Sequence, residues 1–342
     1  IVLMATMVLF FTNSVVVKML PFDNKNEFQV IIDMPEGTTL ERTGVVTQEI
    51  AQYLSTRPEV VNYQNYVGTS APITFNGLVR HYDLRGGSNM ADIQVNLVAK
   101  EERDIQSHGI AKLLRPEIQR IAAKYNANVK LVEVPPGPPV LSTIVAEVYG
   151  PDYDAQIKIA SSIKDILKDT EDVVDIDWFV EADQKEYQLE IQKEKAMLYG
   201  VTPQQIASTM KLALSNNPIT SLYDEDAVQQ IGLVLTLDEK EKSTILDISQ
   251  LKVKSNTGNL IPIADLVIIK ETIASKSIYR KNQKRVVYVT ADMAGELESP
   301  AYAILGMGEK LDRIPLPEGY KLNEMYLGQP KYEDDFTVKW DG

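Results

Sequence analysis

Residues 27–43 read EFQVIIDMPEGTTLERT and contain a strand pattern, a Pro-Gly turn and a helix start in direct succession. Apolar and polar residues alternate through EFQVIIDM, which places Phe28, Val30 and Ile32 on one face of a strand. The spacing of Thr38–Glu41 predicts a capping box. The helix that follows has an apolar stripe of Leu40, Val46, Ile50, Tyr53 and Leu54.

This small α/β unit continues with two more strands, VVNYQNYVG (60–68) and ADIQVNLVA (91–99). A second helix, with a kink expected at Pro116, is indicated by Ile110, Leu113, Leu114, Ile118 and Ile121. KLVEVPP (130–136) is the fourth strand. The order βαββαβ is that of a ferredoxin-like unit.

The same order begins again after PPGPPV (135–140), which predicts a stiff boundary. TIVAEVYG (143–150) and VVDIDWFV (173–180) are expected strands, with a helix between them that runs through Ile159, Ile163, Ile166 and Leu167. RVVYVTADM (285–293), a helix through Ile304, Met307 and Leu311, and YKLNEMYL (320–327) complete the second set.

Residues 188 to about 272 separate the two halves of this second unit and have a pattern of their own. A short helix, a turn at Gly200 and a helix opened by Thr202 and Pro203 are predicted first. Strands are expected next at QIGLVLTL (230–237), LKVKS (251–255) and LIPIADLVII (260–269). The segment is therefore predicted to be a small inserted α+β subdomain.

Composition narrows the classes of function. The 342 residues carry a net charge of −13, so no cationic surface is available to displace counterions from nucleic acid. There is no cysteine, hence no disulfide framework and no thiolate site. Residues 1–17 are uncharged and apolar, slightly fewer than the roughly 20 residues that span a bilayer. We interpret residues 1–18 as the end of a transmembrane helix; a buried core helix is the alternative.

Two stretches carry a resemblance to a known family. LPFDNKNEFQVIIDMPEGTTLERT (20–43) and IQKEKAMLYGVTPQQIASTM (191–210), in this order of units, resemble the second large periplasmic loop of the resistance–nodulation–division (RND) efflux permeases of the AcrB-like hydrophobe/amphiphile branch. The resemblance implies an α+β fold of two ferredoxin-like porter subdomains, the second split by a docking subdomain. The implied ranges are 22–138 for the first porter subdomain, 139–187 with 273–336 for the second, and 188–272 for the docking subdomain.

The resemblance also implies a function. Such permeases are proton-driven exporters of the inner membrane of Gram-negative bacteria, and this segment would lie in the periplasm. It would form part of the substrate cleft of a homotrimer and contact a periplasmic adaptor and an outer-membrane channel. The expected cargo is small and amphiphilic, with no cofactor. Because proton-coupling residues lie in membrane helices, this segment is expected to be a transporter fragment and not an enzyme.

One sheet face of the first unit is the candidate substrate site. Strand alternation turns polar residues away from the helix stripes, and such a face can simply meet water. The resemblance implies instead that it borders the substrate cleft. Amide side chains there favour cargo with hydrogen-bonding groups. The candidate cleft residues are Gln29, Ile31, Gln64, Tyr66, Gln94 and Asn96.

Residues 68–89 form a long connection between the two middle strands, and loops of this length are often functional. The resemblance implies a mobile loop beside the cleft; a loop packed over the sheet edge is the alternative. Its candidate residues are Phe75, Gly77, Leu78 and Tyr82.

Other classes of function have weaker support. Export of soft metal ions would call for several methionines around the cleft, but only Met90 stands at such a position, while Val30 and Val140 occupy the others. His81 and His108 have no partner at motif spacing and are predicted to be surface residues. No metal or catalytic motif is present. Lipid export and a stand-alone ferredoxin-like ligand-binding module remain as further alternatives.

Overall fold

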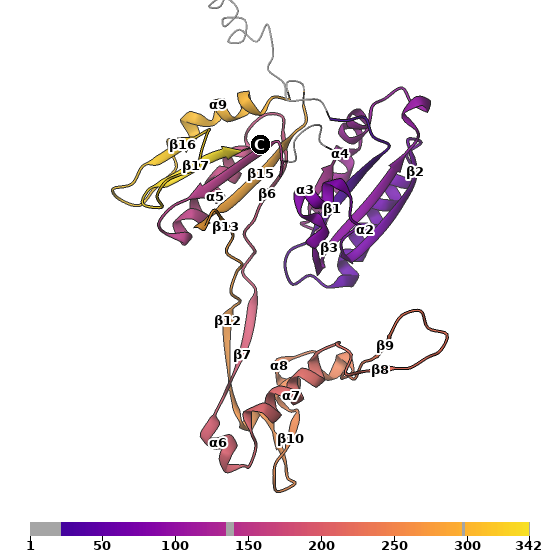
Figure 1. Cartoon of the computed structure of the whole chain (residues 1–342), viewed down its shortest axis with the longest axis vertical. Coiled ribbons are helices and arrows are strands. Elements are labelled where there is room, and N and C mark those ends of the chain that lie inside the picture. Colours follow the sequence, from indigo (N-terminus) through magenta and orange to yellow (C-terminus); the bar gives the residue numbers. More distant parts are fainter. Residues whose placement is uncertain (1–21, 135–139, 296–297, 342) are drawn as a thin grey trace, which may run out of the picture. The chain divides into compact units, whose positions relative to one another are not determined.

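The computed structural model describes residues 22–134, 140–295 and 298–341, except the side chains of Phe75, Asn76 and Glu239. These residues fall into two compact units, with the divisions after Ala182 and after Ser275. We call residues 183–275 the inserted unit and the remainder the two-sheet unit (Figure 1). The fold is mixed α+β.

The first sheet of the two-sheet unit has four antiparallel strands in the order β2-β3-β1-β4. Two helices pack on one face, where alternate strand residues such as Phe28, Val30 and Ile32 form a core with Ile50 and Leu114. The elements are β1 (Glu27–Asp33), α2 (Leu40–Ser55), β2 (Val60–Thr69), α3 (Phe75–Arg80), η1 (Tyr82–Leu84), β3 (Gly86–Leu97), η2 (Lys100–Glu102), α4 (Ser107–Lys124) and β4 (Asn128–Val132).

The second sheet has five strands in the order β16-β17-β5-β15-β6. Its own core joins strand residues to two helices, α5 and α9. β17 lies between β16 and β5, and no strand was predicted in this C-terminal stretch. The elements of this sheet and its helices are β5 (Ile144–Tyr149), α5 (Tyr153–Lys168), β6 (Val173–Trp178), β15 (Val287–Met293), α9 (Pro300–Leu311), β16 (Leu322–Met325) and β17 (Phe336–Asp341). Before β15, β13 (Arg280–Lys281) pairs with β14 (Lys284–Arg285) as a separate two-stranded sheet.

The inserted unit has a small core that includes Ala196, Ile206 and Ile263. β7 pairs with β12, β8 with β9, and β10 with β11, all antiparallel. The predicted 260–269 strand is divided by the 3₁₀ turn η4. The elements are β7 (Lys185–Ile191), α6 (Lys193–Leu198), α7 (Pro203–Leu214), β8 (Thr220–Leu222), β9 (Ile231–Leu233), η3 (Glu239–Glu241), α8 (Ile245–Ser249), β10 (Lys252–Lys254), β11 (Leu260–Pro262), η4 (Ile263–Asp265) and β12 (Val267–Ile273).

The helix starts agree only in part with the prediction. Thr202 caps α7 with a full capping box to Gln205, and Gly200 before it has φ +68°, a left-handed turn that suits glycine. The capping box predicted for α2 is wrong: Thr39 at the N-cap makes no side-chain cap hydrogen bond. The hydroxyl of Thr38 donates instead to the Pro35 carbonyl, because the turn before α2 offers that acceptor.

Two predicted features lie outside the described residues: the transmembrane helix end over residues 1–18 and most of the Pro-rich boundary at 135–140. Within the residues that are described, no helix has the length and apolar character needed to cross a bilayer.

Candidate functional site on the first sheet

Three glutamines from neighbouring strands lie side by side on the face of the first sheet that is turned away from α2 and α4. Gln29 of β1 is opposite Gln94 of β3, and Gln94 is opposite Gln64 of β2. The same face continues with Ile31, Asp92 and Tyr66 on one side of this row and with Glu27, Asn96 and Asn62 on the other. The register thus gathers the six candidate cleft residues on one face; their role in binding stays a prediction.

This face is open along β2, where Asn62 and Gln64 are exposed, and is closed at Asp92 of β3, which is 1% exposed. Gln64 is exposed and Gln94 half-buried, whereas Gln29 is 3% exposed and Ile31 is fully buried. The side-chain oxygens of Gln29 and Gln94 are buried and have no hydrogen-bond partner among the described residues. Buried unpaired amide oxygens are costly, so a bound hydrogen-bond donor would stabilise them.

The β1 and β4 half is covered by the segment between Gly68 and Asn89, which contains α3 and η1. The Arg85 guanidinium binds the carboxylates of both Asp33 and Asp92 and donates to the Ile32 carbonyl at 3.0 Å. The backbone N–H of Ala71 donates to Asp92 at 2.9 Å. The segment is therefore anchored on the sheet face at both of its ends.

The predicted loop residues have different surroundings. The Gly77 N–H donates to the Thr74 hydroxyl at the start of α3, and Leu78 is 58% exposed. The Tyr82 ring centroid lies 5.7 Å from the Arg85 guanidinium carbon and 5.9 Å from Lys130 Nζ. Burial raises the pKa of the Tyr82 hydroxyl. The side chain of Phe75 lies outside the described ones.

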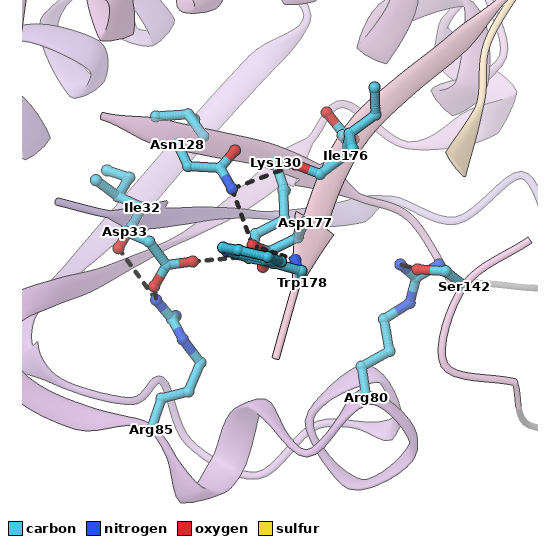
Figure 2. A network of polar contacts seen from close by, with 12 residues as sticks. Ile32, Asp33, Arg80, Arg85, Asn128, Lys130, Ser142, Ile176, Asp177 and Trp178 are labelled. Carbon is cyan, nitrogen blue, oxygen red and sulfur yellow. Dashed lines mark hydrogen bonds and ion pairs between the residues drawn. The ribbon is translucent and has the colours of Figure 1, made fainter. Parts of the chain in front are cut away.

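Buried ion pairs connect this face to the second sheet (Figure 2). Lys130 of β4 lies 2.8 Å from Asp33 and also binds Asp177 of β6. Arg80 of α3 binds Asp292 of β15 at 2.7 Å, and both side chains are less than a tenth exposed. Charges in a protein interior are stable only when they are paired. These ion pairs therefore connect the first sheet and α3 to the second sheet.

A β-bulge directs a third acidic residue across the same junction. The register between β15 and β6 shifts around Asp175, whose φ of +52° is left-handed. Asp175 binds Arg115 of α4 and accepts the Leu131 N–H at 3.2 Å. Bulges commonly re-aim a side chain in this way.

The buried carboxylates differ in acidity. Burial by itself would raise the pKa of Asp33, but the neighbouring charges of Lys130 and Arg85 lower it to about 2. For Asp175 burial dominates over the attraction of Arg115 and raises its pKa to about 6. Asp33 is thus ionised at neutral pH, whereas burial makes Asp175 a weaker acid than an exposed aspartate.

The two histidines have different settings. His81 is exposed at the end of α3, as predicted. The prediction that His108 is a surface residue is wrong, because its side chain is only 19% exposed and its two ring nitrogens contact Glu133 and Glu298. Those contacts depend on folding and leave no trace in sequence spacing.

The methionine positions bear on the metal alternative. Met90 is opposite Asp33 and so belongs to the open sheet face, whereas Val30 is fully buried on the helix side. The described residues contain no group of three or more His, Cys, Asp or Glu side chains able to hold a metal ion.

The ion pairs were missed by the sequence prediction. A usable indication exists in Asp33, Asp92 and Lys130, which are charged residues inside strands that are otherwise apolar or amide-bearing. Charged residues are rarely buried unless they are paired. Their partners, however, come from distant segments, so the sequence shows the charges without the pairing.

Comparison with known proteins places the chain in a family. The sequence model of the AcrB/AcrD/AcrF family matches residues 1–332. The chain is 21% identical over 312 residues to the swarming motility protein SwrC of Bacillus subtilis (strain 168), a match that covers 89% of the chain and 27% of SwrC. It is also 21% identical over 312 residues to the multidrug export protein AcrF of Escherichia coli (strain K12), covering 88% of the chain and 28% of AcrF.

Metal-resistance proteins are similar too. The nickel and cobalt resistance protein CnrA of Cupriavidus metallidurans is 24% identical over 159 residues, 46% of the chain and 15% of CnrA. A crystal structure of a heavy metal efflux pump superposes on the whole chain with a TM-score of 0.73 at 16% identity, and the match covers 33% of that pump.

The chain therefore belongs to the AcrB/AcrD/AcrF family of RND efflux permeases. It spans less than a third of the length of the curated relatives that it matches.

Proposed function

We propose that the chain is the periplasmic porter and docking portion of a proton-driven RND exporter of the inner membrane, acting as a transporter and not as an enzyme. The family match over residues 1–332 supports the transport role. The observation that carries the choice of cargo is the amide row on the first sheet, with two buried oxygens that have no hydrogen-bond partner among the described residues. A ligand that donates hydrogen bonds would satisfy them. The cargo we propose is accordingly amphiphilic and polar.

The parts of the chain take roles within this proposal. Residues 22–138 and residues 139–187 with 273–336 are the two ferredoxin-like porter subdomains. The βαββαβ order of the first sheet's elements supports this assignment. Residues 188–272 are the docking subdomain, which the separate core of the inserted unit supports. The full-length pump is proposed to be a homotrimer joined to a periplasmic adaptor and an outer-membrane channel.

Metal export is the second candidate. It is favoured by the similarity to a nickel and cobalt resistance protein and to a heavy metal efflux pump. A susceptibility panel separates the two candidates. The full-length gene and its adaptor, expressed in a host without its own pumps, would be tested against dyes, detergents, bile acids, polar antibiotics, copper, nickel and cobalt. Protection against metals alone would overturn the amphiphile proposal.

Replacing Gln64 with Phe is expected to weaken protection against polar cargo and to spare protection against apolar dyes. The change removes one exposed amide from the row, and a lost hydrogen bond of about 1 kcal/mol weakens binding about fivefold. Inhibitory concentrations across the panel measure the effect. Gln52→Phe, on the exposed side of α2, is the matched control and should change nothing. An identical profile for the two variants would contradict the polar-cleft proposal.

The β8–β9 hairpin supports the docking role. It is an exposed two-stranded arm whose residues 215–237 contain three acidic and no basic side chains. Tyr223 and Val228 are 86% and 101% exposed. Isolated hairpins are marginally stable in water, which favours a partner surface that is apolar with a basic rim.

Replacing Tyr223 and Val228 together with Ser is expected to abolish protection by the full-length pump without lowering its amount in the membrane. The change removes apolar contact area at the tip of the arm and leaves the core of the inserted unit intact. Chemical cross-linking to the channel, read with the susceptibility panel, is the measurement. Leu246→Ser, which is also exposed in this unit, is the control. Normal cross-linking by the double variant would argue against a docking role for the arm.

A further inference from the structure

His108 lies between two carboxylates from different parts of the two-sheet unit. It projects from α4, and its Nδ1 is 2.7 Å from an oxygen of Glu133, which follows β4. Its Nε2 is 2.9 Å from an oxygen of Glu298, which precedes α9. The ring also stacks on Phe22 at 4.9 Å between centroids. A single side chain therefore joins the first sheet's layer of helices to the segment that enters α9.

The hydrogen bonds of His108 require a proton. A neutral imidazole has one N–H donor, and an ionised carboxylate can only accept. Both ring nitrogens face carboxylate oxygens, so both bonds exist together only when the ring is an imidazolium. Glu133 is 5% exposed and its second oxygen has no partner among the described residues. Without the proton, one of the two contacts becomes a repulsion between lone pairs.

The charges around the ring lead to the same conclusion. From α4, Lys112 contacts Glu298 at 2.7 Å and the Gly295 carbonyl at 2.5 Å. From the segment before β1, the backbone carbonyl of Asp23 accepts from the hydroxyl of Ser107. The carboxylate of Asp23 is paired with Lys25. About two turns further along α4 from His108, Arg115 is paired with Asp175. The ring thus faces two carboxylates and one lysine, and its proton balances the cluster.

Two acidic residues at this junction have a strained backbone conformation. Glu298 has φ +47° and Asp175 has φ +52°, in the left-handed region that residues other than glycine rarely adopt. From the second sheet's side of the junction, Glu298 contacts His108 of α4 and Asp175 contacts Arg115 of α4. Strained residues persist where surrounding contacts hold them, and they are frequent in switching segments. If the bond to His108 is lost, Glu298 has less to hold it in place.

We propose that His108 is a proton-operated clamp that fastens α4 to the segment leading into α9. The clamp goes beyond the proposed transport function and does not depend on the cargo. When the His108 ring is protonated it donates both hydrogen bonds, and when it is neutral it can donate only one. The contact between the two sheets is therefore tightened by acid and loosened by alkali in the range around neutral pH.

The sign of this pH dependence follows from the acidities. The bond to Glu133 raises the pKa of His108 above the ordinary 6.5, and partial burial opposes the rise. The clamp's contribution is therefore complete below pH 6.5 and is lost as the pH rises through the raised value. The raised pKa of Asp175 has the same sign, but its effect falls between pH 3.8 and about 6, below the range in which the clamp opens. Burial would raise the pKa of Glu298, but its bonds to Lys112 and His108 lower it, so the opposite dependence begins only in acid.

The first test measures the pH at which the His108 ring gains its second proton. The chain contains only two histidines, so His81→Gln leaves a single imidazole for nitrogen-15 NMR of the complete chain. We expect a titration midpoint above that of a histidine model peptide in the same sample, with both ring nitrogens protonated below it. Glu298→Gln should lower the midpoint. A midpoint at or below that of the peptide, or no response to Glu298→Gln, would overturn the proposal.

The second test measures the distance between α2 and α9, which lie on opposite sides of the clamp. The chain has no cysteine, so Val45→Cys on α2 and Leu305→Cys on α9, which are 55% and 68% exposed, can carry two unique spin labels. We expect a narrow distance distribution at about pH 6 and a broader one at about pH 8.5. His108→Gln should remove this difference and His81→Gln should keep it. Glu298→Gln should also remove it, which gives a second reading if His108→Gln folds poorly. A pH response that survives both variants would refute the clamp.

Discussion

Replacing Arg80 with Met is expected to destabilise the two-sheet unit by about 3–5 kcal/mol, the cost of leaving one partner of a buried ion pair alone. Among the described residues, Asp292 would then keep the Thr143 N–H, 3.0 Å away, as its hydrogen-bond donor. In the native protein burial would raise the pKa of Asp292, but the charge of Arg80 lowers it. Without Arg80 that carboxyl should take up a proton more readily.

Urea unfolding of the complete chain, followed by tryptophan fluorescence, measures this loss. Both tryptophans, Trp178 and Trp340, belong to the second sheet, so they report on the side of the junction that holds Asp292. Arg120→Met is the matched control, because its pair with Glu117 is on the surface and worth at most about 1 kcal/mol. Similar losses for the two variants would mean that the Arg80 pair does not hold the sheets together.

Replacing Lys130 with Met is expected to cost about 3–5 kcal/mol near neutral pH and to flatten the acid dependence of stability. Lys130 faces both Asp33 and Asp177, so its removal brings two carboxylates together without the cation between them. Because the pKa of Asp33 is lowered from 3.8 to about 2, its stabilising contribution is present above pH 3.8 and is lost as the pH falls toward 2. Arg85 would preserve part of this dependence.

Unfolding curves recorded between neutral pH and about pH 2 test this prediction. Lys124→Met is the control, since its partner Glu49 is nearer the solvent. We expect the control to lose little stability and to keep the acid dependence of the native chain. If Lys130→Met keeps that dependence in full, Arg85 alone sets the acidity of Asp33.

The strand faces could be predicted because alternation is local. Gln29, Gln64 and Gln94 each occupy a position set by the period of their own strand, and the register then aligns them. The capping box at Thr202 was equally accessible, since donor and acceptor are three residues apart. At Thr38 and Glu41 the same kind of signature failed, because α2 begins at Leu40, which makes Thr39 the N-cap and places Glu41 at the second helical position and not the third.

The covered half of the sheet face could not be predicted for a different reason. Arg80 and Asp292 are 212 positions apart, and no periodicity relates them. Arg85 joins two strands that are neighbours only after folding, and it belongs to a segment whose sequence indicates a loop. Pairings of this kind are set by tertiary structure, so a single sequence identifies the charged residues and leaves their partners open.

The position of β17 also governs the order in which the molecule can form. β5 begins the second sheet, yet its neighbour β17 is made only after the inserted unit and β15 have been synthesised. Contacts between distant segments form slowly because the long loop between them must close first. As the chain emerges into the compartment where it folds, the first sheet and the inserted unit can each collapse around a core of their own while β5 still has an unpaired edge. Unpaired edges invite association with other chains, so this interval is the stage of synthesis at which a chaperone would be of most use.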